Sequence, residues 1–185
     1  MRMHQRRLIE LIRRETPNPK AGAEIGVYRG ELSALLCETF PKMLLVMVDP
    51  WCEWPEGSSY HDQHVKMGFD DRQKWDKVYS EAVDNVLGKN CAIIRKTSCR
   101  AAKEDVKDNS LDFVFLDANH TYESVREDIE LWTPKVRVGG LISGHDYGGK
   151  MDKKGVWGVS KAVHEAFGQE KVMSPGGLVW AVVKT

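Results

Sequence analysis

The sequence predicts a three-layer α/β fold, with helices on both faces of a mostly parallel β-sheet. Short apolar runs alternate along the chain with segments whose apolar residues recur every three or four positions, the pattern of strands followed by helices. The run 111–116 is apolar at five of its six positions, which is typical of a strand buried on both faces. Near the end, Pro175-Gly176-Gly177 separates two strand-like runs and predicts a β-hairpin.

In the first half of the chain, breaker residues separate the expected elements. An amphipathic helix with its cations facing water is expected before Thr16, and Thr16-Pro17-Asn18-Pro19 ends it. The next elements expected are a strand at 21–27, a helix at 31–40 and a strand at 43–48.

The second half continues the alternation of strands and helices. A regular i, i+3, i+4 spacing predicts a helix at 75–87, which Gly88 ends. The remaining elements expected are strands at 91–94, 111–116 and 141–143, helices at 100–107, 121–136 and 159–167, and the hairpin at 171–184. Because the composition does not change along the 185 residues, we expect one domain over 1–185, with 1–20 as its N-terminal helix and linker.

Residues 51–71 form a stretch of a different kind. They show neither the strand nor the helix period, yet they are rich in aromatic side chains, namely Trp51, Trp54, Tyr60 and Phe69. Long irregular loops inside compact domains are usually functional. We therefore expect this stretch to be a lid that shapes the pocket of a substrate.

Charge and composition exclude several classes of partner. Lys plus Arg and Asp plus Glu both number 27, so the formal net charge is zero and predicts no nucleic-acid or membrane partner. No apolar run approaches the roughly 20 residues that cross a bilayer, and we see no signal peptide. The four cysteines lack CxxC spacing, which indicates reduced thiols and a cytoplasmic location.

Polar groups stand where the expected parallel strands end. Because the carboxyl ends of parallel strands meet at one edge of a sheet, these groups could bind a nucleotide-like ligand together. They are Glu24 with Gly26, Asp49, Ser98, Asp117, and His145 with Asp146. The spacing of Gly26 and Gly30 is not G-x-G-x-x-G, which counts against a nicotinamide-dependent oxidoreductase.

Three stretches, AEIGVYRGELSALL, VMVDPW and LDFVFLDANHTYESVREDIELWTPKVRVGGLISGHDY, resemble class I S-adenosylmethionine-dependent methyltransferases. Within that class the chain is similar to the small-molecule O-methyltransferase-like group called methyltransferase family 24. The resemblance runs from Ala21 to Tyr147. It implies a Rossmann-like sheet of seven strands with the last strand inserted antiparallel, S-adenosylmethionine as cofactor and a small-molecule methyl acceptor.

The resemblance also implies which residues bind the cofactor. Its first motif approaches the methionine part, an acid after the second strand binds the ribose, and later residues border the adenine and the sulfonium. The residues at these positions are, in order, Glu24, Gly26, Val27 and Tyr28; then Asp49; then Pro50, Trp51 and Ser98; and finally Asp117.

In metal-dependent members of the class, the positions of Asp117, His145 and Asp146 carry cation ligands. Position 145 usually holds Asp or Glu there, and this chain has His. Mg²⁺ prefers oxygen ligands, whereas two carboxylates with one imidazole suit Fe²⁺ or Mn²⁺. A metal-free site is the alternative, with a histidine as general base: His120, His145, or His61 or His64 from the expected lid.

The sequence therefore predicts S-adenosylmethionine-dependent O-methylation of a small molecule, with Asp117, His120 and His145 as the catalytic residues. A divalent cation (Mg²⁺, Mn²⁺ or Fe²⁺) is an open part of this prediction, and so is a homo-oligomer. The alternatives are a catalytically silent protein that binds S-adenosylmethionine and, on a similar sheet, a nicotinamide-dependent oxidoreductase.

Overall fold

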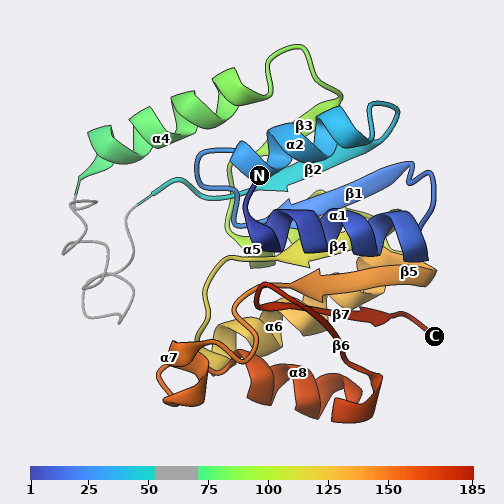
Figure 1. The fold of residues 1–185 in the computed structure, drawn as a ribbon. Coiled ribbons are helices and arrows are strands. Elements are labelled where there is room, and N and C mark those ends of the chain that lie inside the picture. Colours follow the sequence, from blue (N-terminus) through green and yellow to red (C-terminus); the bar gives the residue numbers. More distant parts are fainter. Residues whose placement is uncertain (53–70) are drawn as a thin grey trace.

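The computed structural model of the protein describes residues 1–52 and 71–185, which fold around a single twisted sheet (Figure 1). Its seven strands lie in the order β3-β2-β1-β4-β5-β7-β6. The strands are β1 (Ala21–Ile25), β2 (Leu44–Val48), β3 (Cys91–Ile94), β4 (Leu111–Leu116), β5 (Val136–Gly144), β6 (Met173–Gly176) and β7 (Val179–Val183). Strands β1 to β5 are parallel, and β7 runs antiparallel to both β5 and β6. The predicted fold class is confirmed.

Helices cover both faces of the sheet and make the three layers. One hydrophobic core lies beneath α1 (Met3–Glu15), α2 (Glu31–Thr39) and α4 (Arg72–Asn85). The other lies beneath α5 (Ser98–Glu104), α6 (Tyr122–Trp132) and α8 (Val159–Phe167). The short elements are α7 (Lys150–Lys153) and the 3-10 turns η1 (Thr133–Lys135) and η2 (Gln169–Lys171).

Strand β4 lies in the middle of the sheet and contributes side chains to both cores. Phe113 and Phe115 point into the first core, while Val114 and Leu116 point into the second, and all are buried. Each such side chain stabilises the fold by roughly 1.5–3 kcal/mol when it leaves water. This explains why the run is apolar without alternation, and it fixes Asp117 at the end of a rigid strand.

The structure corrects the expected boundary between α6 and β5. The sequence predicts a helix to Val136 and a strand only at 141–143, but β5 begins at Val136, where the side chain is fully buried. Gly139 and Gly140 lie inside the strand, at a register shift against β4, and Gly139 has a positive φ of 77°. Glycines that normally mark a turn here form an irregularity within a strand.

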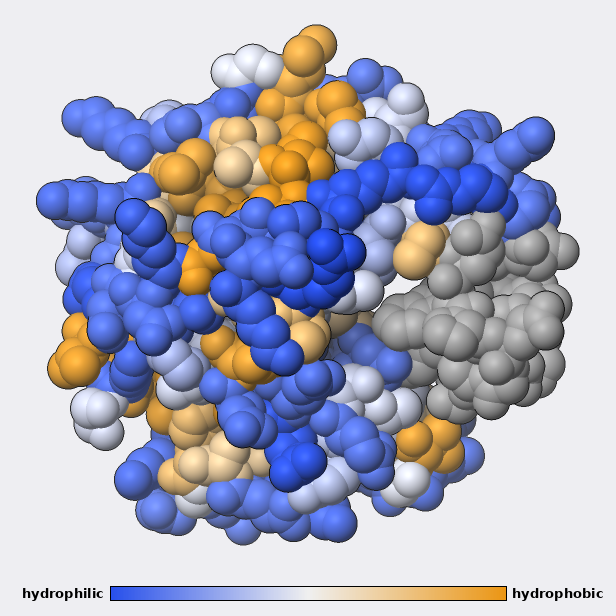
Figure 2. Space-filling view, turned by 180° about the vertical axis from the view of Figure 1, so that it is seen from behind, coloured by the Kyte–Doolittle hydropathy of each residue, from blue (hydrophilic) through white to orange (hydrophobic). Residues whose placement is uncertain are grey.

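The expected lid falls mostly on residues that the structure does not describe. The predictions for Trp54, Tyr60, Phe69, His61 and His64 lie outside the described residues. Within the described residues, no helix has both the length and the apolarity needed to cross a membrane. Seen from behind, the surface is mostly hydrophilic, with hydrophobic side chains gathered toward the top of that view (Figure 2).

Candidate active site

A cavity of about 570 Å³ lies at the carboxyl ends of β1, β2 and β4. Among the described residues, its lining includes Gly26, Tyr28, Asp49, Pro50, Ser98, Asp117, His120 and Asp128. Pockets for small ligands usually measure about 300–1,000 Å³. The cavity therefore has the position and the size of a ligand site in an open α/β sheet.

The loops after β1 and β4 touch each other at the bottom of this cavity. Gly26 has a φ of 89°, and a Cβ added there would lie 2.3 Å from the carbonyl oxygen of Asp117. The Asp117 N–H also donates to the carbonyl of Ile25 at 2.8 Å. Only glycine combines this backbone conformation with this close approach. The two loops are therefore held as one unit.

Asp49 ties the loop after β2 to the loop after β1. Its carboxylate accepts hydrogen bonds from the backbone N–H groups of Val27 and Tyr28, both at 3.0 Å, and from that of Trp51 at 2.8 Å. The Trp51 indole donates back to the Tyr28 carbonyl at 2.7 Å. Trp51 is fully buried and packs edge-on against Tyr79. It supports the loop from below and is not part of the cavity lining.

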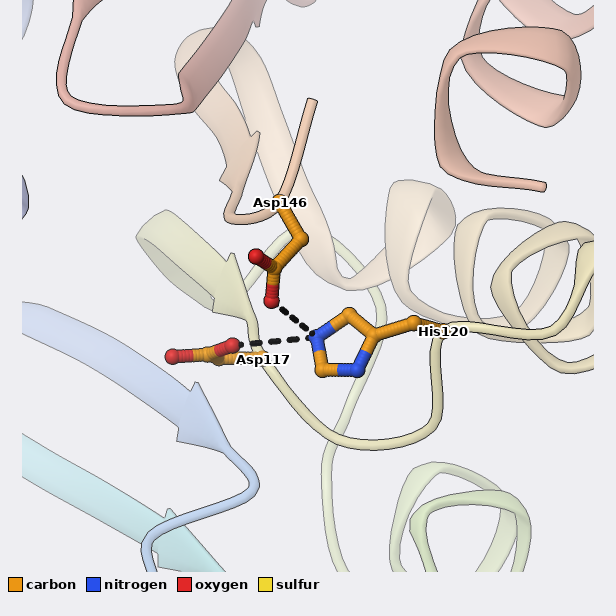
Figure 3. Close-up of side chains that lie close together, drawn as sticks. All are labelled: Asp117, His120 and Asp146. Atoms are coloured by element: carbon orange, nitrogen blue, oxygen red, sulfur yellow. Dashed lines mark hydrogen bonds and ion pairs between the residues drawn. The ribbon is translucent and has the colours of Figure 1, made fainter. Parts of the chain in front are cut away.

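Two carboxylates and two imidazoles meet between the ends of β4 and β5, and we call Asp117, His120, His145 and Asp146 the acid–imidazole cluster. His120 Nε2 lies 3.2 Å from Asp117 Oδ1 and 3.0 Å from Asp146 Oδ2, so that both carboxylates point at one ring nitrogen (Figure 3). His145 Nδ1 lies 3.5 Å and 3.3 Å from the same two oxygens. Anionic and imidazole groups therefore alternate around a small centre.

The cluster changes the acidity of its members. Burial disfavours the charged imidazole of His120, but hydrogen bonds with Asp117 and Asp146 outweigh burial and raise its pKa to about 9. The same balance raises the pKa of His145 to about 10. Burial works against both carboxylates as well, yet their bonds to the two imidazoles hold the pKa of Asp117 and of Asp146 below the ordinary value. As it stands, the cluster pairs two imidazolium ions with two carboxylates at neutral pH.

Neighbouring rings hold the imidazoles in place. The His4 ring, from the first turn of α1, lies 4.6 Å from the His145 ring. Trp157, between α7 and α8, stacks on His120 with 4.8 Å between ring centroids. The Gly158 N–H donates to the His120 carbonyl at 2.9 Å. His4 and Trp157 were not among the predicted site residues, because no pattern links either one to a strand end.

Ser98 lies in the cavity wall, as part of a buried polar group. Its hydroxyl donates to the carboxylate of Asp128 and accepts from the Trp132 indole at 2.8 Å. Asp128 is 8% exposed, and burial raises its pKa to about 7. Asp128 was not among the predicted site residues, because on α6 it resembles any polar residue of an amphipathic helix. A period-3.6 count that included Asp128 on the face of Val125 and Trp132 would have shown it pointing inward.

The predicted cofactor residues thus divide into two groups. Gly26, Tyr28, Asp49, Pro50, Ser98 and Asp117 line the cavity, whereas Glu24, Val27 and Trp51 lie behind it. Glu24 is buried, bonded to the Ser33 hydroxyl, and burial raises its pKa to about 8. The predicted metal ligands Asp117, His145 and Asp146 do converge, and His120 joins them: ligand atoms of Asp117, His120 and Asp146 all lie within 4.8 Å of one another.

The chain is similar in sequence to a known family of protein domains. The family model of the methyltransferase domain Methyltransf_24 matches residues 23–147. An uncharacterised protein of Sinorhizobium fredii (strain NBRC 101917 / NGR234), y4gI, is 34% identical over 65 residues. That match covers 35% of this chain and 7% of the relative, so the chain spans only a small part of that protein's length.

Solved structures share the fold at low sequence identity. A candidate caffeoyl-CoA O-methyltransferase from Staphylococcus aureus is 16% identical, with a TM-score of 0.64 over 100% of this chain and 84% of that one. The O-methyltransferase NovP is 18% identical, with a TM-score of 0.59 over 97% and 80%. CalS11, a TDP-rhamnose 3′-O-methyltransferase, is 16% identical, with a TM-score of 0.56 over 95% and 77%. With the family match covering most of the sheet, the chain belongs to the Methyltransf_24 family of methyltransferase domains.

Proposed function

We propose that the protein transfers a methyl group from S-adenosylmethionine to a hydroxyl group of a small molecule. The observation that carries this proposal is the position of Asp117, which lines the cavity and also belongs to the acid–imidazole cluster. A ligand in the cavity and an acceptor beside the cluster would meet at this side chain. The family match and the O-methyltransferases of similar fold support the same reaction.

The residues of the cavity fit S-adenosylmethionine in shape and charge. The loop after β1 can come close to the cofactor at Gly26, where any side chain would collide with the Asp117 backbone. Asp49 offers a carboxylate to ribose hydroxyls, as acids at the second strand end of such sheets do. Asp117 supplies the negative charge that a sulfonium requires, and Tyr28 adds an aromatic ring at the rim.

S-adenosylmethionine supplies the methyl carbon, whose bond to sulfur breaks as its bond to the acceptor oxygen forms, while the acceptor's hydroxyl proton must leave. The acid–imidazole cluster is the group of residues that can take up that proton. His120 is the better placed of the two imidazoles, because it lines the cavity and His145 does not. Its two carboxylate partners orient the ring and keep it protonated below its pKa of about 9, so His120 can accept the proton only in its deprotonated form, and transfer by this route should rise as pH approaches 9. A divalent cation held by Asp117, Asp146 and the histidines is the other means of activating the hydroxyl.

Calorimetric titration of the full chain tests the cofactor. We expect saturable heat from S-adenosylmethionine and none from NAD, with the heat reduced by Asp117→Asn and unchanged by Asp108→Asn. Asp108 is exposed and comes just before β4, at the amino ends of the parallel strands, whereas the cavity lies at their carboxyl ends. Heat from NAD alone would overturn the proposal.

Transfer itself is tested with methyl-labelled S-adenosylmethionine and two acceptor classes. These are caffeoyl-CoA and TDP-rhamnose, which the names of structurally similar enzymes contain. The expected outcome is a labelled O-methyl group on the acceptor, and this labelling should be lost in His120→Gln. Binding of S-adenosylmethionine with no transfer to any hydroxylated acceptor would favour the catalytically silent alternative instead.

A further inference from the structure

Three side chains from α5 and α6 form a hydrogen-bonded chain that ends at the cavity. The Trp132 indole N–H donates to the Ser98 hydroxyl oxygen at 2.8 Å, and that hydroxyl donates to Oδ1 of Asp128. Both bonds have a fixed direction, because an indole N–H can only donate and an ionised carboxylate can only accept. The hydroxyl hydrogen of Ser98 is therefore used inside the protein, and its oxygen has one lone pair left for a ligand.

Asp128 adds a second acceptor to the same part of the cavity wall. Its side chain lines the cavity, yet the residue is only 8% exposed. Its Oδ1 accepts from Ser98, whereas its Oδ2 has no hydrogen-bond partner among the residues that the structure describes. An oxygen of a buried carboxylate that lacks a partner costs free energy until a donor reaches it. This part of the wall is therefore suited to a ligand that brings N–H donors.

The charge of the cavity wall favours the same kind of ligand. Among the described residues of the lining there is no Lys or Arg, and four acids are present: Asp49, Asp117, Glu127 and Asp128. The imidazole of His120 also lines the cavity, but its Nε2 bonds to carboxylates of the acid–imidazole cluster. A ligand group with lone pairs would thus meet carboxylate and hydroxyl oxygens at this wall, and repulsion would oppose it.

We propose that Ser98 and Asp128 select the base of the cofactor by its hydrogen-bond polarity, accepting from the 6-amino group of a purine and rejecting a 6-oxo purine. This inference rests on the proposed function, which puts the adenine of S-adenosylmethionine beside Ser98. A 6-amino group brings two N–H donors to the two acceptors, whereas a 6-oxo group opposes its own lone pairs to theirs. Asp128 then contacts the cofactor directly, a role that the family resemblance does not give to any residue of α6.

Calorimetry of the full chain with S-adenosylhomocysteine and its 6-oxo analogue, S-inosylhomocysteine, tests the proposal. The titrations are made at pH 8, where Asp128, with a pKa of about 7, is mostly ionised. We expect the wild type to bind the adenosyl ligand at least about 10-fold more tightly than the inosyl ligand.

Asp128→Asn keeps the shape of the side chain and replaces one acceptor with an N–H donor. The affinity for the adenosyl ligand should fall while that for the inosyl ligand rises, which brings the two within about threefold of each other. Ser98→Ala removes the other acceptor and should also reduce the preference, so the proposal can be tested even if Asp128→Asn does not fold. Glu127→Gln is the matched control. Glu127 is an exposed acid of α6 that lines the same cavity, so its loss should leave the ratio of the two affinities unchanged.

The opposite changes in the two affinities distinguish base selection from a role in packing, because damage to the fold would weaken both ligands in parallel. Parallel losses in Asp128→Asn would overturn the inference, and so would an unchanged ratio in both Asp128→Asn and Ser98→Ala. Either result, with tight binding of the adenosyl ligand by the wild type, leaves the methyltransferase proposal standing. A wild type that binds neither ligand removes that proposal and this inference with it.

Discussion

His120 Nε2 lies 3.0 Å from Asp146 Oδ2, and this contact joins the loop after β4 to the end of β5. Asp146 reaches it from a left-handed backbone conformation, with a φ of 59°. Asp tolerates that conformation better than most residues do. The carboxylate is therefore aimed at the imidazole by the backbone itself, and the consequences of removing it can be stated.

Replacing Asp146 with Asn should lower the pKa of His120 from about 9 toward the ordinary 6.5. The carboxylate stabilises the imidazolium, and an uncharged amide does so far less. Imidazole resonances followed by NMR across a pH titration measure this shift. Asp108→Asn, at the opposite end of the strands from the cluster, should leave the His120 titration unchanged. An unaltered His120 pKa in Asp146→Asn would show that the 3.0 Å contact does not form in solution.

Gly26→Ala should destabilise the protein by about 2–4 kcal/mol and abolish binding of S-adenosylmethionine, because its Cβ meets the Asp117 carbonyl oxygen in a left-handed conformation. Gly88→Ala is the matched control. Gly88 also has a positive φ, of 74°, but open space surrounds it, so a loss of only about 1 kcal/mol is expected. Urea unfolding of both variants measures the difference. Equal losses would mean that the approach of the two loops is unimportant.

Asp128→Asn should make the free energy of unfolding less dependent on pH. The Asp128 carboxyl has a pKa of about 7 in the folded chain against an ordinary 3.8, so the folded state holds a proton that the unfolded state releases. Stability from this group is therefore complete below pH 3.8 and falls as pH rises toward 7, by on the order of 4 kcal/mol.

Denaturant unfolding of wild type and Asp128→Asn between pH 4 and pH 8 measures that difference. The variant should gain relative stability as pH rises, and Asp84→Asn, an exposed change on α4, should not. A difference between wild type and Asp128→Asn that is constant over this pH range would contradict the prediction.

Asp112→Ala should destabilise the fold by about 2–3 kcal/mol while leaving the affinity for S-adenosylmethionine unchanged. Asp112 accepts from the backbone N–H groups of Lys20 and Ala21 at 2.6 and 2.9 Å and pairs with Arg137. Removing it leaves backbone donors without a partner. It lies at the amino end of β4, across the sheet from the cavity. Thermal unfolding together with calorimetry tests both halves, and a weakened affinity would contradict the second.

The fold could be predicted because its central strands and helices have distinct local patterns of apolar residues. The unbroken apolar run of β4 and the regular spacing in α4 each correspond to one kind of element. The β5 boundary could not, since Gly139 and Gly140 are equally compatible with a turn and with a strand irregularity, and only pairing with β4 and β7 decides between them.

For the site, the parallel strand pattern made it predictable that Asp49, Asp117 and Asp146 lie at the same end of the sheet. Side-chain direction was not predictable. Trp51 follows Asp49 closely, yet its side chain turns into the core. The Asp128 side chain points toward Ser98, although the sequence of its helix shows only the usual amphipathic pattern. His4 depends on how α1 crosses the sheet, which no local pattern encodes.

The contact between His4 and His145 has a consequence for the order in which the protein is made. About 140 residues separate these two rings, so the first turn of the chain leaves the ribosome long before its neighbour exists. Gly26, Asp49 and the other described cavity-lining residues all precede residue 129, whereas the cluster also needs residues 145 and 146. A nascent chain that stops before residue 145 would therefore contain the residues of the cavity lining but an incomplete acid–imidazole cluster.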